Sequence, residues 1–193
     1  SATGNSVFLS QAIVWSDLVH ALFWNEDSHG YFFTASDAEN LIVRTTQVTD
    51  AATPSGNGVM LNNLARLFFL TGDDRFRIRA ESLIEAFDVD ALRDFPHTCS
   101  FLNGFELFTD SLQVIVIGDR SDPNAKALLS AALSSSHPNL ILSTVNDKDA
   151  LPADHAAYGK STIDGKVTAY VCRGPLCQAP VTSPDDLRAA LVA

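Results

Sequence analysis

The chain has 193 residues, of which 46% are hydrophobic and 19% are charged, a composition typical of one folded domain with a sizeable core and at most a subdomain. Thirteen basic residues against 23 acidic ones give a net charge of −10. Because no Lys/Arg cluster could neutralise several phosphates, we exclude nucleic acid and anionic membranes as expected partners.

The first residues form neither a basic segment nor a hydrophobic one, and the sequence has no run of about 18 apolar residues. Cys99, Cys172 and Cys177 cannot all pair within one chain, so they do not form a disulfide scaffold. We therefore expect a soluble, cytoplasmic protein in a reducing compartment. The missing initiator Met and the early start of a helix suggest a part of a longer protein.

The N-terminal part is predicted to be helical. Apolar residues from Phe8 to Leu22 recur at spacings of four and three, which predicts a helix over residues 6–24. Residues 25–54 form a structured loop or hairpin. Residues 57–87 form an antiparallel helix pair joined at Gly72, for which we expect a positive φ. A fourth helix covers residues 99–108.

After residue 109 the pattern changes to strands alternating with helices. β-Branched apolar residues predict a buried strand over 112–117, and further strands over 140–145 and 166–171. Asp122 precedes a proline and begins a helix to about residue 134, and Ser183 begins the last helix, to about residue 192. Neither GxGxxG nor a P-loop is present, so we expect no nucleotide cofactor.

Five short motifs resemble a known family. Residues 50–57 read DAATPSGN, residues 64–67 LARL and residues 70–74 LTGDD, and near the end residues 168–172 read TAYVC and residues 177–182 CQAPVT. Together they are similar to the thioredoxin-domain-containing family related to spermatogenesis-associated protein 20. The resemblance covers most of the chain.

The resemblance implies a particular architecture. Members of that family have a thioredoxin-like domain followed by an (α/α)6 toroid of the six-hairpin glycosidase and N-acylglucosamine 2-epimerase type. The chain would be the C-terminal part: a mainly α fold with toroid hairpins in residues 1–109 and a small α/β subdomain in residues 110–193. The redox-active thioredoxin domain is missing here. Phe33 stands where the family has an acid, and Ala51 where it has a glycine.

The resemblance places a toroid mouth at the loop of residues 24–57. We expect the mouth to bind a small carbohydrate, because an aromatic ring there can stack on a sugar and Gly56, with a positive φ, lets the backbone approach a ligand. The alternative is a solvated loop that covers helix ends, with Asp50 as a brace. The candidate residues for substrate binding are Trp24, His29, Tyr31, Arg44, Asp50, Ser55 and Asn57; no catalytic residue is identified.

The cysteines and histidines give weaker indications. Cys172 and Cys177 form either two packed thiols, a disulfide or redox pair, or part of a zinc site with His97 and Cys99; we expect no metal. His137 and His155 are expected at the surface.

The sequence therefore leaves two functions open. The first is a fragment of a sugar epimerase or glycoside hydrolase of carbohydrate metabolism, and the second is a non-catalytic scaffold or interaction module. The expected partners are a carbohydrate and either the N-terminal part of the same protein or a second copy. The interface is expected from apolar residues of the helices, namely Phe8, Trp15, Leu64, Phe68, Phe76 and Leu83.

Overall fold

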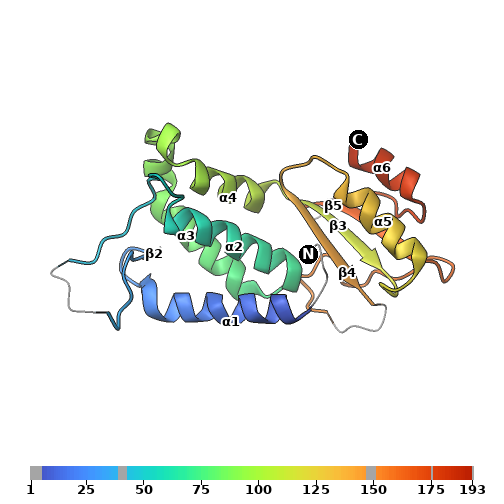
Figure 1. Ribbon diagram of the computed structural model, residues 1–193, viewed down its shortest axis with the longest axis horizontal. Coiled ribbons are helices and arrows are strands. Elements are labelled where there is room, and N and C mark those ends of the chain that lie inside the picture. The colour runs from blue at the N-terminus through green and yellow to red at the C-terminus, as the bar shows by residue number, and fades with distance from the viewer. Residues whose placement is uncertain (1–5, 39–42, 147–150, 175, 193) are drawn as a thin grey trace. The chain divides into compact units, whose positions relative to one another are not determined.

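The computed structural model describes residues 6–38, 43–146, 151–174 and 176–192. The chain divides into two compact units (Figure 1). The helical unit comprises Ser6–Phe68 and Asp74–Phe108, and the α/β unit comprises Phe69–Asp73 and the described residues from Thr109 onward. With a four-stranded sheet in the second unit, the fold is mixed α/β, so the expected mainly α fold with a small α/β subdomain is confirmed only in part.

Among its described residues, the helical unit has four α-helices. They are α1 (Ser6–Phe23), α2 (Gly56–Thr71), α3 (Asp74–Arg93) and α4 (Cys99–Thr109), with the short 3-10 helix η1 (Phe95–His97) before α4. All four α-helices contribute apolar side chains to one core. Leu64, Phe76 and Leu83 are fully buried in that core, so they are not available for the interface expected from the sequence.

Helix α1 is apolar on two sides. Leu9, Ile13 and Val19 pack against the core, whereas Phe8 and Trp15 are exposed. Although its sequence contains Ser, Gln, Asp and His, α1 is by length and composition apolar enough to cross a membrane, a property that core helices and signal sequences also have.

Glycines in α2, after it and in α4 differ in their surroundings. A Cβ on Gly58 would lie 2.7 Å from the backbone nitrogen of Phe101, and one on Gly104 would lie 3.0 Å from the nitrogen of Asn62, so α2 and α4 are in close backbone contact at both positions. Gly56 begins α2 with open space around it and is not among the positive-φ glycines, which corrects the expectation for its φ. The positive φ predicted for Gly72 is confirmed at 67°.

The α/β unit contains a mixed sheet in the order β4-β3-β5-β6. Strands β3 (Leu112–Ile117) and β4 (Leu140–Val145) are parallel and are connected through α5 (Pro123–Leu133). Strand β5 (Thr168–Arg173) is antiparallel to β3, and the edge strand β6 (Leu176–Cys177) is antiparallel to β5. The predicted third strand is confirmed, although it begins two residues later. Helix α6 (Pro184–Val192) follows.

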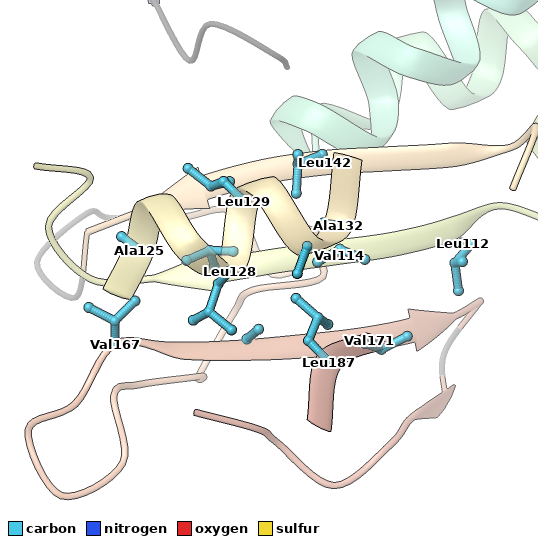
Figure 2. Packing of buried hydrophobic residues seen from close by; sticks show 13 residues of the cluster. Leu112, Val114, Ala125, Leu128, Leu129, Ala132, Leu142, Val167, Val171 and Leu187 are labelled. Carbon is cyan, nitrogen blue, oxygen red and sulfur yellow. The ribbon is translucent and has the colours of Figure 1, made fainter. Parts of the chain in front are cut away.

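Both faces of this sheet are covered. Figure 2 shows α5 and Leu187 of α6 packed against one face, where they meet Val114 and Val171. On the other face, Ile115 and Ile117 pack with Ala157. His155 lies in the same segment and is 4% exposed, and its Nδ1 accepts a hydrogen bond from the Ala157 N–H at 3.0 Å. Because this histidine is buried, the expectation of a surface position was wrong.

Candidate functional site

The loop between α1 and α2 begins with a small hairpin. Strand β1 (Trp24–Asn25) pairs with β2 (Gly30–Tyr31), so that Trp24 stands opposite Tyr31. His29 closes the turn with a φ of 55°, and its N–H bonds to the Asn25 carbonyl at 2.9 Å. The hairpin thus places three of the predicted site residues within a few residues of the end of α1.

Four rings form the aromatic cluster: His20, Trp24, His29 and Tyr31. The Trp24 and His29 rings are stacked, with centroids 6.0 Å apart and an interplanar angle of 11°. The Tyr31 ring meets Trp24 edge-on at 5.0 Å. His20 lies 5.0 Å from Trp24, and its Nδ1 is 3.3 Å from the Tyr31 hydroxyl. Such offset and edge-on arrangements are favourable because of the ring quadrupoles.

Charged groups surround the aromatic cluster. The Trp24 Nε1 donates a hydrogen bond to the exposed Glu26 carboxylate at 3.2 Å. Asp17 pairs with Arg75 at 3.0 Å and with Arg79 at 2.9 Å. Although burial raises the pKa of Asp17, the two arginines outweigh this effect and lower it.

Two rings of the cluster, His20 and Tyr31, are neutral at pH 7. Burial, assisted by the charge of Arg79, lowers the pKa of His20, although Glu26 and Asp17 oppose the shift. Burial also raises the pKa of Tyr31 well above its usual range. His20 and Tyr31 therefore offer neutral hydrogen-bonding groups, while the Glu26 carboxylate accepts a hydrogen bond from the Trp24 indole.

The remaining four site residues bond chiefly to the backbone. Asn57, which is 2% exposed, accepts the Tyr31 N–H at 2.7 Å and donates to the Tyr31 carbonyl at 3.0 Å and the Gln47 carbonyl at 2.8 Å. Arg44 donates to the carbonyls of Thr34 and Leu22 at 2.6 and 3.2 Å, with its guanidinium 4.0 Å from the centre of the Phe32 ring. These two residues fix the hairpin to its surroundings.

Asp50 and Ser55 organise the start of α2. Asp50 accepts the N–H groups of Ser55 and Ser100, each at 2.8 Å, and also the Ser100 hydroxyl. Ser55 Oγ in turn accepts the Gly58 N–H at 3.0 Å, as expected for an N-cap. Although burial raises the pKa of Asp50, the hydrogen bonds from Ser100 and Ser55 outweigh burial and lower it. Asp50 therefore stays ionised as a brace between two helices.

The contacts of the carboxyl groups determine whether acid–base chemistry is available at the aromatic cluster. Hydrolysis of a glycosidic bond needs two carboxyl groups about 5–10 Å apart. Asp50 accepts three protein donors, and Asp17 is paired with two arginines, so neither is available as an acid or base at the aromatic cluster. In the described ranges there is also no group of three or more His, Cys, Asp and Glu residues that could hold a metal.

Two residues that contribute to the site were not identified from the sequence. His20 belongs to the aromatic cluster, and its position four residues before Trp24 places both on one side of the chain at the end of α1. Ser100 bonds to Asp50 across 50 residues of sequence, a separation that leaves no local signal. The structure brings Trp24, His29 and Tyr31 together, whereas Arg44, Asp50, Ser55 and Asn57 are occupied with the backbone around them.

Comparison with known proteins gives relatives for nearly the whole chain. No family model matches it. The chain is 30% identical to human spermatogenesis-associated protein 20 and 29% identical to the rat protein, in each case over 98% of its own length. An uncharacterized protein of Caenorhabditis elegans is 22% identical over 97% of the chain. The chain spans only 25% of the length of the human protein. It is therefore similar to one quarter of spermatogenesis-associated protein 20.

Proposed function

We propose that the helical unit binds a carbohydrate at the aromatic cluster, as part of a longer protein with a six-hairpin, toroid-like fold. The observation that carries the proposal is the stack of the exposed His29 ring on Trp24, with the Glu26 carboxylate bonded to the same indole. Sugars have C–H faces that pack on aromatic rings and hydroxyls that need acceptors. The stack and the carboxylate supply both.

The proposed role of this chain is binding rather than catalysis. Glu26 is exposed, whereas Asp17 and Asp50 are committed to arginines and to backbone groups. Neither Asp17 nor Asp50 can therefore serve with Glu26 as the second carboxyl group that a glycosidase needs. If the longer protein is a glycoside hydrolase or a sugar epimerase, its reacting groups would come from the three quarters of the length that this chain does not span.

Sugar titration of matched variants tests this proposal. We expect N-acetylglucosamine or cellobiose to give saturable heat in calorimetry with the wild-type chain. His29→Asn, which tolerates the positive φ but removes the ring stack, and Trp24→Ala should each weaken binding at least tenfold. Phe33→Ala is the control, because Phe33 is 74% exposed in the same loop and is not part of the aromatic cluster. Equal affinities of the Trp24→Ala, His29→Asn and Phe33→Ala variants, or no binding by the wild type, would contradict the proposal.

A second candidate function, a scaffold or interaction module, is favoured by α1. Phe8, Val14, Trp15 and Leu18 are each more than half exposed. At about 100° per residue these four positions fall within an arc of about 120°, opposite the side that packs on the core. An apolar stripe of this kind is typical of a surface that another helix covers. Its occupant would be a helix of the longer protein or of a second copy.

A further inference from the structure

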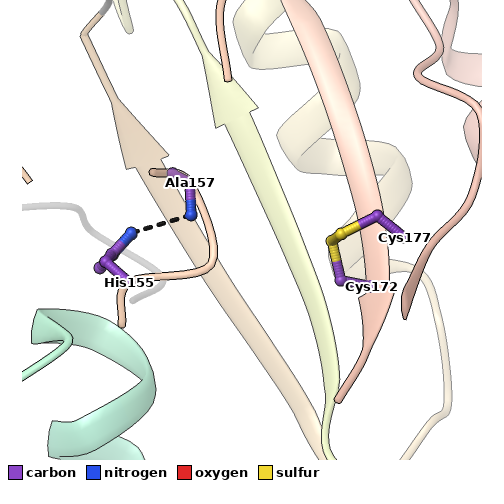
Figure 3. The surroundings of a disulfide bond; sticks show 4 residues. All are labelled: His155, Ala157, Cys172 and Cys177. Carbon is purple, nitrogen blue, oxygen red and sulfur yellow. Dashed lines mark hydrogen bonds between the residues drawn. A yellow bond between two sulfur atoms is a disulfide. The ribbon is translucent and has the colours of Figure 1, made fainter. Parts of the chain in front are cut away.

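The α/β unit contains a disulfide bond that joins neighbouring strands. Cys172 of β5 stands directly opposite Cys177 of β6, with the Cα atoms 4.0 Å apart and the sulfurs bonded (Figure 3). Of the alternatives left open by the sequence, the disulfide is therefore the one found. Cys99 is a free, exposed thiol.

The two sulfurs are in different environments. Cys172 is 1% exposed and packs with Ile115, Ile117 and Val145. Cys177 is an exposed residue of the two-residue edge strand β6. A thiolate attacks a disulfide at the sulfur that it can reach in line. An external thiol therefore meets Cys177 first, and Cys172 is the leaving sulfur.

The sheet does not depend on this bond. The disulfide closes a loop between residues only five apart in sequence, and a short loop constrains the unfolded chain least. Strands β3, β4 and β5 are held by six-residue ladders, and the backbone bonds between Ala169 and Val181 and from Gln178 to Val171 continue beyond β6. Reduction therefore releases a cross-link at an edge without removing the pairing of the central strands.

We propose that Cys172–Cys177 is a reversible thiol–disulfide exchange site whose substrates are thiols, with Cys177 as the attacked sulfur. The thiolate of a donor forms a mixed disulfide with Cys177, and Cys172 leaves as a thiolate that takes a proton from water. A second donor thiolate attacks the mixed disulfide and releases Cys177, which is likewise protonated. Two donor thiols are oxidised to one disulfide, and the protein disulfide is reduced to two thiols.

Burial of Cys172 determines the character of the exchange. A buried thiolate is a poor leaving group because charge is costly in apolar surroundings. We therefore expect thiol exchange at this site to be slower than in a dedicated oxidoreductase. The disulfide would then follow the thiol–disulfide balance of its surroundings. This site lies on the sheet of the α/β unit and is independent of the sugar site proposed on the helical unit.

The first test counts thiols in the native chain. The chain is equilibrated in mixtures of reduced and oxidised glutathione, acid-quenched, and labelled with a maleimide that adds a fixed mass to each thiol. We expect Cys172 and Cys177 to be unlabelled under oxidising conditions and all three cysteines to be labelled under reducing conditions, with reversal on reoxidation and an unchanged far-UV circular dichroism spectrum. One label at 10 mM reduced glutathione, or loss of the fold when three labels are taken up, would overturn the proposal.

The second test identifies the attacked sulfur. In a Cys99→Ser background, Cys172→Ser leaves Cys177 as the only thiol, and Cys177→Ser leaves Cys172. Both variants are treated with an aromatic disulfide whose released thiol absorbs light. We expect Cys177 to react at least tenfold faster than Cys172 in the native state, and both to react at similar rates in denaturant. Equal native rates, or a faster Cys172, would contradict the assignment.

Discussion

Asp50 accepts hydrogen bonds from both the N–H and the hydroxyl of Ser100, although 50 residues separate the two in sequence. Ser100 lies in the first turn of α4, and Asp50 also accepts the Ser55 N–H at 2.8 Å, just before α2. One carboxylate therefore joins the beginnings of two helices. A negative charge at helix N-termini is favourable because of the orientation of the backbone dipoles.

We expect Asp50→Asn to lower the free energy of unfolding by about 1–2 kcal/mol, because an amide removes the charge and one acceptor oxygen from three donors. Thermal melting without ligand measures the change. Asp27→Asn, in the same loop with an exposed side chain, is the control and should melt like the wild type. If Asp50→Asn melts like the wild type but loses sugar binding, Asp50 is a ligand-binding residue rather than a brace.

The pH dependence of this brace has a definite sign. Because the pKa of Asp50 is lowered from its ordinary 3.8, its stabilising contribution is fully present above pH 3.8 and is lost as the pH falls through the folded-state pKa. Urea unfolding at pH 5 and pH 2.5 should therefore give a larger stability difference between wild type and Asp50→Asn at pH 5 than at pH 2.5. A difference that is the same at both pH values would mean that the charge does not contribute.

Gly58 provides a test of how α2 meets α4. A Cβ at this position would lie 2.7 Å from the nitrogen of Phe101 and 2.8 Å from the carbonyl carbon of Ser100, both backbone atoms that cannot turn aside. We expect Gly58→Ala to destabilise the chain by about 1–3 kcal/mol through overpacking. Urea denaturation checks this value.

The matched control for Gly58→Ala is Gly56→Ala. Nothing lies within 4 Å of a Cβ at Gly56, and the residue begins the helix without a positive φ. Alanine there should be neutral or should stabilise the chain by about 0.4–1 kcal/mol, because it restricts the unfolded chain. A smaller loss of stability for Gly58→Ala than for Gly56→Ala would contradict the close contact between α2 and α4.

Several parts of the fold could be predicted because they depend on local patterns. The spacing of Phe8, Ala12 and Trp15 is that of a helix, and the β-branched run of residues 112–117 is that of a buried strand. The two-residue strands and η1 are too short for any period to show. The same periodicity did not reveal that α1 would be apolar toward both the core and the solvent. The spacing of apolar residues defines which side chains share a face of the helix, but not what packs against that face.

The candidate site was only partly predictable for a similar reason. Trp24, His29 and Tyr31 are close in sequence, so a hairpin can bring them together. The partners of Asp50 and Cys172 depend instead on how whole elements are placed. Asp50 meets Ser100 through the packing of α2 against α4, and Cys172 meets Cys177 through the register of β5 and β6.

We expect stability to fall as the pH drops below 6.5, because burial lowers the pKa of His20 and of His155 from that value. The unfolded chain then binds more protons than the folded chain, so the contribution is present above pH 6.5 and is lost below it. Thermal melts at pH 7.5 and 5.5 measure the loss. His20→Gln and His155→Gln should each make it smaller, and a loss as large as in the wild type for both variants would contradict the prediction.

The apolar stripe of α1 predicts association. Phe8, Val14, Trp15 and Leu18 are 64, 58, 63 and 54% exposed, and burying such side chains against a partner is favourable by roughly 25 cal/mol per Å² of apolar area. We expect the isolated chain to form dimers or larger species as its concentration rises through the micromolar range in sedimentation velocity. Trp15→Glu should restore the monomer, because association would bury an unpaired charge.

The control is Leu92→Glu. Leu92 is 71% exposed on α3, outside the stripe, and the variant adds the same charge to a chain that already carries a net charge of −10. If the wild type sediments as a compact monomer at every concentration, or if Leu92→Glu dissociates it as well as Trp15→Glu does, the stripe is not an interface between copies.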